Sequence, residues 1–428
     1  MPRVLLVAAT TGYQTRAFDE AARHLGLDLV LATDRCHVLE DPWGDRAIPV
    51  RFDDPHASRD VLVAAGPFDA IVAVADRPAL IAAMAAEVLG VPYHSPAAVA
   101  ACHDKYLARQ RFEAAGLPVP KFFRVPVTAN PLEAAARAPF PCVLKPLGLS
   151  ASRGVIRANN VAEFETAFIR IRALLGSADI AVMREEQNRY IQVESYIDGR
   201  EFALEGLVTA GELQVLAIFD KPDPLDGPFF EETIYVTPSR ESLETQRALV
   251  AAARSAIRAL GLTHGPIHAE LRMQGRAAWM LEVAARPIGG LCARTLRFDD
   301  GVPLEELILR HAVGEDVSRM RLSDSASGVM MIPIPKGGGV YQGVEGLEQA
   351  SAIPDVEDVI ITAKEGQKIQ PLPEGASYLG FIFTRAGSPA RVEHALREAH
   401  ACLKFDIAIG FTPPDLHRRR GARFSRAR

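Results

Sequence analysis

Two glutamates and an arginine lie close together in one stretch of the chain, with a spacing that suits binding of a metal ion and an anion. The segment "GPIHAELRMQGRAAWMLEVAARPIGG" (265–290) is typical of two strands joined at a "QGR" turn and followed by a loop. Glu270 and Glu282 are equally far from Arg276, so side-chain alternation predicts that they face each other across the hairpin. Arg286 and two glycines follow directly.

Opposed carboxylates need a partner that offsets their repulsion. Two charges about 4 Å apart repel by about 4 kcal/mol at an effective dielectric constant of about 20. A divalent cation between them turns repulsion into attraction, and carboxylate oxygens are ligands that Mg²⁺ accepts. The alternative is a pair of solvated charges at a strand edge, which the apolar flanks and Arg286 make less favourable. The guanidinium of Arg286 suits a bidentate contact to phosphate or carboxylate.

A second stretch, "LKPLGLSASRGV", has the composition of a phosphate-binding loop. Lys145 ends an expected strand, and Gly148 and Gly154 bracket small residues that include Ser150 and Ser152. Such a loop brings backbone N–H groups close to phosphate oxygens, and the lysine adds a positive charge. The GxxxxGK[ST] pattern is absent, and an ordinary flexible hairpin loop is equally compatible with these residues.

The elements that must position these residues follow from periodicity. Residues 1–100 alternate buried strands with helices, which predicts a parallel sheet with crossover helices. Residues 95–120 predict one or two helices, and 190–221 predict antiparallel strands separated by "DG" and "AG" turns. A helix is expected over 244–261, and glycine-rich short strands and a strand–helix–strand unit after about 313. The first strand–helix turn, "AATTGYQT", lacks GxGxxG and therefore predicts no dinucleotide site.

Composition restricts the class of protein. The length of 428 residues suggests about three domains, and the formal net charge of −5 gives no reason to expect a nucleic-acid partner. No apolar run reaches the length of about 18 residues that a membrane span needs. Five scattered cysteines without a CxxC pair argue against disulfides or zinc and fit a reducing cytosol, so a cytoplasmic location is expected. The arginine-rich end, 417–428, is expected to be a disordered tail rather than a nucleic-acid arm.

In order and spacing, these segments resemble the ATP-grasp superfamily, and within it the L-amino acid ligases that make dipeptides. The most specific motif is "HAELRM…WMLEVAARPIGG", supported by the lysine loop and by "VESYIDGRE". The resemblance covers nearly the whole chain and implies an α/β (α+β) protein with an ATP-grasp core. The implied domains are a Rossmann-like domain at 1–100, an ATP-grasp domain at 101–313 with a nucleotide-binding part at about 120–195, and a ligase-type domain at 314–416.

The resemblance also implies roles for individual residues. Lys105, in "HDKYL", and Lys145 would contact the ATP phosphates, and the loop with Ser150, Ser152 and Gly154 would fold over them. The backbone of a hinge would read adenine, and Glu201 would bind the ribose; the hinge residues are Glu194, Ser195, Tyr196 and Ile197. Glu270 and Glu282 would hold Mg²⁺, with Mn²⁺ as the alternative ion, and Lys221 would reach the γ-phosphate. Arg286 and the backbone N–H of Gly289 would hold the transferred phosphoryl group; the residues expected to face the amino acids are Glu232, Tyr235, His268 and Gly290.

Three positions depart from the wider pattern. Ala284 stands where many ATP-grasp enzymes have a metal-binding asparagine. The motif "EVAAR" shares the absence of this asparagine with the amino acid ligases. Gly290 stands where some relatives have a bulky side chain, which predicts a roomier pocket for the first amino acid. Tyr235 stands where a relative has histidine, so the identity of the amino acid that supplies the amine is left open.

The implied activity is ATP-dependent formation of a dipeptide through an acyl-phosphate, with ADP and phosphate released. Two alternatives stay open at this point. One is an ATP-grasp ligase for another carboxylate, or a carboxylating enzyme of the biotin-carboxylase type. The other is a nucleotide-binding regulator without turnover, against which both lysines, both glutamates and Arg286 argue. The expected partners are ATP and amino acids, and the resemblance leaves a homodimer open.

Overall fold

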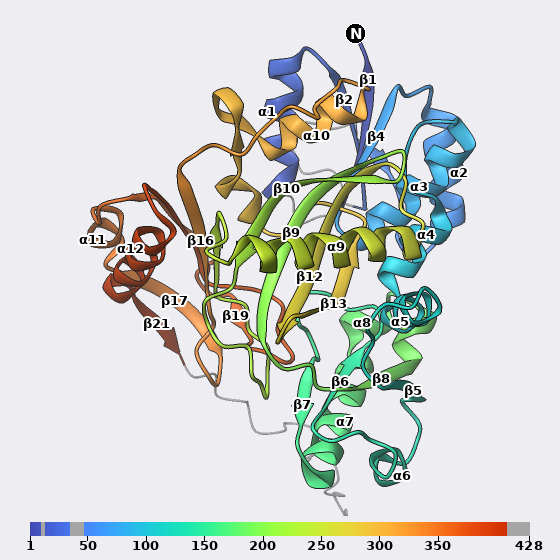
Figure 1. The fold of residues 1–428 in the computed structure, drawn as a ribbon, viewed down its shortest axis with the longest axis vertical. Coiled ribbons are helices and arrows are strands. Elements are labelled where there is room, and N and C mark those ends of the chain that lie inside the picture. Colours follow the sequence, from blue (N-terminus) through green and yellow to red (C-terminus); the bar gives the residue numbers. More distant parts are fainter. Residues whose placement is uncertain (10–12, 35–46, 409–428) are drawn as a thin grey trace, which may run out of the picture.

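The computed structural model describes residues 1–9, 13–34 and 47–408. Cys36 and the arginine-rich end at 417–428 lie outside the described residues. Figure 1 shows three neighbouring regions around a large central sheet, which are an N-terminal α/β region, a small sheet with helices, and a C-terminal layer. The mixed α/β (α+β) class predicted from the sequence is confirmed.

The N-terminal region is a four-stranded parallel sheet in the order β3-β2-β1-β4, as the alternation of strands and helices predicts. Its elements are β1 (Arg3–Ala8), α1 (Tyr13–Leu25), β2 (Asp28–Thr33), β3 (Ile48–Pro49), α2 (Pro55–Ala65), β4 (Ala70–Val74) and α3 (Asp76–Leu89). Leu5 and Val7 pack into one core cluster while Val4 and Leu6 pack into another, so both faces of β1 are covered. This explains the uninterrupted apolar run of the strand.

Two short helices connect this region to the rest, α4 (Pro96–His103) and α5 (Lys105–Ala114). The break falls at Asp104, whose carboxylate caps α5 by accepting hydrogen bonds from the backbone N–H groups of Tyr106 and Leu107. Lys105 is therefore the first residue of α5.

The small sheet is antiparallel with the order β5-β8-β6-β7. Its elements are β5 (Phe122–Pro126), α6 (Pro131–Ala135), β6 (Cys142–Pro146), β7 (Ile156–Ala158), α7 (Val161–Leu175), α8 (Ala178–Ala181), η2 (Glu186–Arg189) and β8 (Tyr190–Ser195). The apolar face of α7 packs on this sheet through Phe164, Phe168 and Ile171.

The central sheet has eight strands in the order β13-β12-β9-β10-β11-β16-β20-β18. The strands are β9 (Arg200–Thr209), β10 (Glu212–Asp220), β11 (Ile234–Thr237), β12 (Gly265–Gln274), β13 (Ala277–Ala284), β16 (Ala326–Ile332), β18 (Val356–Ile361) and β20 (Gly380–Ala386). Helix α9 (Leu243–Leu260) crosses one face, as Figure 1 shows, and α10 (Leu304–Ala312) packs on the other. The sequence predicts a domain boundary at 313, but strands from before and after this position belong to one continuous sheet, in which β11 pairs with β16.

One prediction for the strands at 190–221 is wrong. The "DG" pair, Asp198 and Gly199, was expected to close a hairpin, but β8 belongs to the small sheet and β9 to the central sheet. Residues 196–199 therefore connect the two sheets. The reason is that β8 pairs with β5 and β6, while β9 pairs with β10 and β12, so no edge is left for a β8–β9 pair.

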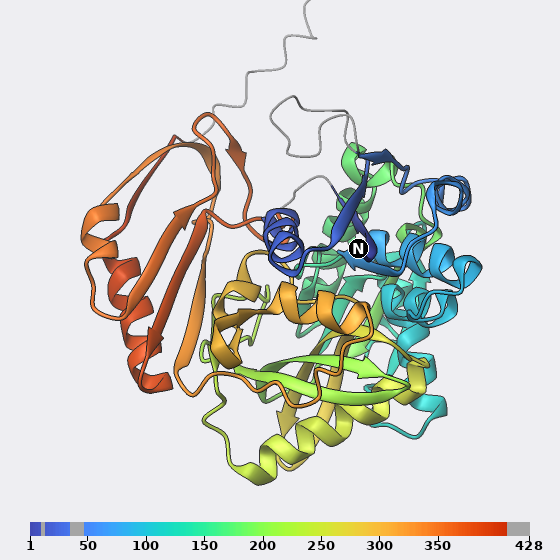
Figure 2. The ribbon, with the colours of Figure 1, turned by 90° about the horizontal axis from the view of Figure 1, so that it is seen from above.

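The C-terminal layer adds a three-stranded sheet, β19-β17-β21, and two helices, seen at one side of the molecule in Figure 2. Its remaining elements are β17 (Gly339–Glu345), α11 (Leu347–Ser351), β19 (Lys368–Ile369), α12 (Pro389–Cys402) and β21 (Lys404–Ala408). Between α9 and this layer the chain forms η3 (Cys292–Thr295), η4 (Asp299–Gly301) and the short pair β14 (Arg297–Phe298) and β15 (Val302–Pro303). Within the described ranges, no helix has the length and apolar character to cross a membrane.

Candidate active site

A cavity of about 620 Å³ lies where the N-terminal region, the small sheet, the central sheet and the segment 362–381 meet. Most residues that the sequence singles out line it, namely Lys105, Lys145, Ser150, Ser152, Glu194, Ser195, Tyr196, Ile197, Glu201, Glu232, Tyr235, His268, Glu270, Glu282, Arg286, Gly289 and Gly290. Gly154 and Lys221 do not line it, although Lys221 donates a hydrogen bond to Glu201, which does, and Gly154 is followed in sequence by Val155, which also does. The ends of β1 and β4 reach the same cavity, as expected for the carboxyl edge of a parallel sheet where the strand order reverses.

The β12–β13 hairpin brings Glu270 and Glu282 opposite each other, as predicted, but by a different route. The turn has two residues, Gly275 and Arg276, and this turn alone would place Glu270 opposite Leu281. A bulge at Leu281 moves the pairing by one further residue, so that Glu270 faces Glu282. Bulges next to active sites commonly re-aim side chains in this way.

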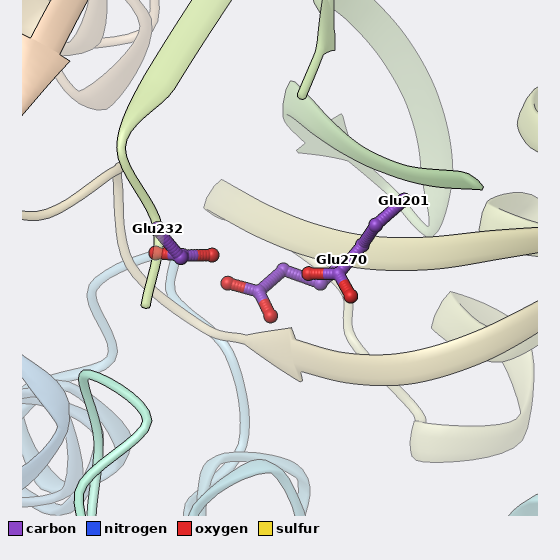
Figure 3. Close-up of side chains that lie close together, drawn as sticks. All are labelled: Glu201, Glu232 and Glu270. Carbon is purple, nitrogen blue, oxygen red and sulfur yellow. The ribbon is translucent and has the colours of Figure 1, made fainter. Parts of the chain in front are cut away.

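Three carboxylates converge at the centre of the cavity. Ligand atoms of Glu201, Glu232 and Glu270 lie within 4.8 Å of one another, and Figure 3 shows the three side chains converging. The Nζ atom of Lys221 lies 2.8 Å from Glu201 Oε1 and 3.7 Å from Glu270 Oε1, and it also donates a short hydrogen bond to Glu232. The ammonium group therefore balances part of the negative charge at this point.

The charges at this cluster shift its pKa values in opposite directions. Burial would lower the pKa of Lys221, but its three carboxylate neighbours raise it well above the ordinary value. Burial, helped by Glu270 and Glu201, raises the pKa of Glu232 against the pull of Lys221. The pKa of Glu270 is lowered instead, because Lys221 and His268 outweigh its burial.

The other glutamate of the hairpin, Glu282, faces a different cation. Its Oε2 atom lies 3.1 Å from Nζ of Lys105, and the same ammonium group donates a 2.7 Å hydrogen bond to the carbonyl of Leu149. Lys105 thus links the hairpin to the loop at 148–154, although it comes from the start of α5.

Lys145 belongs to a buried charge network on the small sheet. It donates a short hydrogen bond to Glu194, whose other oxygen lies 3.0 Å from Nε of Arg109. Gln192 donates a 2.8 Å hydrogen bond to the same carboxylate. Burial lowers the pKa of Lys145 to about 8 despite Glu194, whereas Arg109 and Lys145 overcome burial and lower the pKa of Glu194 to about 2.

Glu201 is anchored on its second side by Arg272. The Nε atom of Arg272 lies 2.8 Å from Glu201 Oε2, and its Nη1 atom donates a 2.7 Å hydrogen bond to the carbonyl of Ile197. The same guanidinium lies over the rings of Tyr196 and Phe230, 5.2 Å and 5.5 Å from their centroids. The connection between the two sheets is thereby tied to the central sheet at the edge of the cavity.

The loop after β13 is fixed from three directions. Arg286 pairs with Asp76 through two contacts, Nε to Oδ1 at 3.0 Å and Nη2 to Oδ2 at 3.3 Å. The N–H of Ile288 donates to the buried carboxylate of Glu205, and the carbonyl of Ile288 accepts a short hydrogen bond from Gln14. The guanidinium of Arg286 is consequently held in one orientation at the cavity wall.

His268 lies between two carboxylates on the central sheet. Its Nδ1 atom is 3.5 Å from Glu205 Oε2, and its Nε2 atom is 3.7 Å from Glu270 Oε1. Burial would lower its pKa, but these two carboxylates raise the pKa of His268 to about 9, so the ring is positively charged at neutral pH. Nearby, the Tyr235 hydroxyl donates a 2.9 Å hydrogen bond to Glu232.

The loop at 148–154 is held against the C-terminal layer. Ala151, Ser152 and Gly154 have positive φ, and a Cβ at Gly154 would lie 2.8 Å from the Pro146 ring. The N–H of Gly154 donates a 2.8 Å hydrogen bond to the carbonyl of Pro373, outside the cavity. This explains why Gly154 shapes the loop without lining the cavity.

Four charged residues of the site escape the sequence reasoning: Asp76, Arg109, Glu205 and Arg272. Two of them leave a signal that could have been used. Glu205 is a carboxylate inside the apolar run "FALEGLV", and Asp76 comes two residues after the end of a buried parallel strand. Arg109 leaves none, because an arginine on a helix is usually solvated.

Comparisons with known proteins agree with this architecture. Residues 138–295 match the family model described as ATP-grasp domain, 19–93 match ATP-grasp N-terminal domain, and 330–408 match L-amino acid ligase C-terminal domain 2. The solved structure of an L-amino acid ligase from Bacillus licheniformis has 27% identity and a TM-score of 0.78, covering 95% of this chain and 99% of that chain.

Two curated relatives match this chain over only part of their own length. The uncharacterized protein y4rH of Sinorhizobium fredii is 26% identical over 319 residues, 74% of this chain and 64% of that protein. Alanine–anticapsin ligase of Bacillus subtilis is 28% identical over 241 residues, 53% of this chain and 50% of the ligase. The chain thus spans about half to two thirds of the length of these relatives.

Proposed function

We propose that this chain, which belongs to the ATP-grasp superfamily and carries the C-terminal domain of the L-amino acid ligases, joins two L-amino acids into a dipeptide at the expense of ATP. The observation that carries the proposal is the convergence of Lys105, Lys145 and Arg286 on one cavity with the facing pair Glu270 and Glu282. A site for phosphoryl transfer to a carboxylate needs this combination, because it must stabilise negative charge spread over several oxygens.

The proposed reaction has two steps. A carboxylate oxygen of the first amino acid attacks the γ-phosphorus of ATP, giving an acyl-phosphate and ADP. The neutral amine of the second amino acid then attacks the acyl carbon, inorganic phosphate leaves with the C–O bond electrons, and the nitrogen gives up one proton as the amide forms. The protein contributes mainly position and charge, because a carboxylate without activation has a poor leaving group.

The donor set fits a divalent metal ion. Glu270 and Glu282 are paired across the hairpin, and ligand atoms of Glu201, Glu232 and Glu270 lie within 4.8 Å of one another. These are hard oxygen ligands of the kind Mg²⁺ prefers, with Mn²⁺ as the alternative. When bound, such an ion would screen the charges of the carboxylates and of the phosphate oxygens.

The remaining residues would act directly on the substrates. Lys105 and Lys145 would neutralise the phosphates under the loop at 148–154, with Lys221 beside the γ-phosphate. The segment 194–197, at the end of β8, would meet the adenine, and Glu201 would meet the ribose. Arg286 and the N–H of Gly289 would hold the acyl-phosphate, while Glu232, Tyr235 and His268 would face the amino acids. This assignment rests on the position of these residues at the cavity, and for Lys221 on its hydrogen bond to Glu201, together with the family resemblance.

Exclusion of water is the second requirement, because an acyl-phosphate hydrolyses readily. The loop at 148–154 is fastened by the Gly154–Pro373 hydrogen bond and by Arg153, whose Nε atom donates to the Glu374 carbonyl at 2.7 Å. Glu374 is also paired with Arg170. The C-terminal layer would thus hold the loop over the phosphates during the reaction.

The test is the variant Glu282→Gln, which keeps the shape of the side chain and removes its charge. Amino-acid-dependent ADP formation is expected to fall by about a hundredfold or more, since several kcal/mol of charge stabilisation depend on this carboxylate. The matched control is Glu244→Gln, because Glu244 is 77% exposed and lies 3.9 Å from Arg276 at the far end of the same hairpin. Near-normal turnover by a folded Glu282→Gln protein would refute the proposed role.

A further inference from the structure

The space beside Gly290 is bounded by an aromatic ring from the C-terminal part of the chain. Gly290 has φ of +62°, and a Cβ built there would lie 3.4 Å from both Cε1 and Cζ of Phe381. The expectation of a roomier pocket considered only the missing side chain at position 290. In the folded chain, Phe381 closes the space next to Gly290 from strand β20.

The Phe381 ring is held firmly in place. Its residue pairs with Met331 of β16 on one side and with Ile360 of β18 on the other, so it lies inside the central sheet. Phe381 is 4% exposed, and its ring packs edge-to-face against Tyr378 with 6.1 Å between centroids. A buried ring that packs against a neighbour, on a backbone paired on both sides, is a rigid wall rather than an adaptable one.

The part of the cavity wall that shares a core cluster with Phe381 is mostly apolar. Besides Ala8 and Val74 near the ends of β1 and β4, the lining residues that belong to this cluster, or pack against it, are Tyr235, Ile288, Cys292, Met331 and Tyr378. A charged side chain placed against Ile288, Met331 and the Phe381 ring would lose its hydration without gaining a partner from these groups, which costs several kcal/mol. This end of the cavity therefore suits an uncharged side chain.

We infer that Phe381 sets the size limit for the side chain of the amino acid whose carboxylate is activated, and that this amino acid is small and uncharged. The inference rests on the proposed function, because it takes Arg286 and Gly289 as the holders of the acyl-phosphate. Gly289, Gly290 and Phe381 line the same cavity, and Phe381 lies next to Gly290. With the acyl-phosphate held at Gly289, the side chain of the activated residue would extend along this wall and meet the Phe381 ring. Phe381 is a specificity-determining residue in a strand far from the ATP-binding segments in sequence.

The chain offers a matched control two residues along the same strand. Phe383 is also buried in this cluster, at 2% exposure, and its ring stacks on Phe381 with 6.3 Å between centroids. It does not line the main cavity, and Arg294 lies over its ring at 4.7 Å instead. Phe383→Ala thus removes an equal side chain from the same core and leaves the cavity wall in place.

The experiment compares the full-length protein with Phe381→Ala, Phe381→Leu and Phe383→Ala. Each is given ATP, Mg²⁺, one acceptor amino acid and a series of donors, namely alanine, valine, leucine, methionine and phenylalanine. Phosphate release gives kcat/KM, and fragment masses of the dipeptide show which amino acid became the N-terminal residue. Phe381→Leu keeps the test open if the alanine variant does not fold.

The expected result is a wild-type preference for small donors that is reversed in the Phe381 variants. The leucine-to-alanine ratio of kcat/KM should rise by at least about tenfold, because one methylene of misfit in an apolar pocket changes this ratio by about 10- to 200-fold. Phe383→Ala should keep the wild-type ratio. An unchanged ratio in a folded, active Phe381 variant would overturn the inference, as would a change confined to the C-terminal residue of the product. A wild-type protein that releases no phosphate with any amino acid would instead overturn the proposed function.

Discussion

The pairing of Arg286 with Asp76 leads to a sharp prediction about the N-terminal region. Asp76 is the first residue of α3 and reaches across 210 positions of sequence to hold the guanidinium at the cavity wall. The substitution Asp76→Asn keeps one oxygen acceptor and removes the charge and the second acceptor. We expect kcat for amino-acid-dependent phosphate release to fall, because Arg286 is then less firmly oriented toward the transferred phosphoryl group.

The size of the effect follows from the contact that is lost. The side chains of Arg286 and Asp76 are only 13% and 20% exposed, so water screens the pair less than it screens a surface pair. One hydrogen bond to a charged group contributes about 1.5–3 kcal/mol, and about 1.4 kcal/mol corresponds to a tenfold change in rate. The expected loss in kcat is therefore about tenfold to hundredfold.

A double-mutant cycle tests whether Asp76 acts through Arg286. In the Arg286→Met background, the further change Asp76→Asn should have no additional effect on kcat. Asp53→Asn is the control, because Asp53 pairs with Arg51 on the surface of the same region, and it should leave kcat unchanged. Unchanged kcat in Asp76→Asn, or an additive loss in the double variant, would refute the reasoning.

Two further predictions concern the phosphate side of the cavity. Burial lowers the pKa of Lys145 to about 8 against the pull of Glu194, so its positive charge is present below pH 8 and is lost as the pH rises through this value. The kcat/KM for ATP should therefore fall above pH 8, by about tenfold per pH unit. Lys145→Arg should remove that fall, because arginine stays charged. A pH profile that stays flat to pH 10 would contradict this. Gly154→Ala should raise KM for ATP, because the residue has φ of +75° and the new Cβ would lie 2.8 Å from the Pro146 ring. The control Gly148→Ala should be tolerated, because its Cβ would meet its nearest neighbours only at 3.5 Å. Equal KM values for the two alanine variants would show that the loop does not depend on this backbone conformation.

Local patterns predicted the elements well and the links between them less well. Neighbours in sequence determine three features that the structure contains: the apolar strand predicted at 3–9, the end of helix α9 at Gly261, and the hairpin with Glu270 and Glu282. The pairing of β8 depends on strands β5 and β6, which lie far from the "DG" signal, so local turn chemistry gave the wrong partner.

The candidate site shows the same division. Residues that the motifs single out line one cavity, whereas most residues that hold them in place come from elsewhere in the chain; Arg272, inside "HAELRM", is an exception. Asp76 fixes Arg286, Arg109 neutralises Glu194, and Phe381 closes the space at Gly290, each across a long sequence separation. Such contacts depend on how the sheets are placed relative to one another, which a single sequence read by period and motif does not contain.

The most direct measurement of the central claim is the mass of the product. The full-length protein is incubated with ATP, Mg²⁺ and pairs of L-amino acids, and dipeptide, ADP and phosphate are quantified together. The account predicts a dipeptide formed in a 1:1 ratio with ADP, and no phosphate release when amino acids are left out. ADP formation without any amide product, or turnover that does not depend on amino acids, would contradict it.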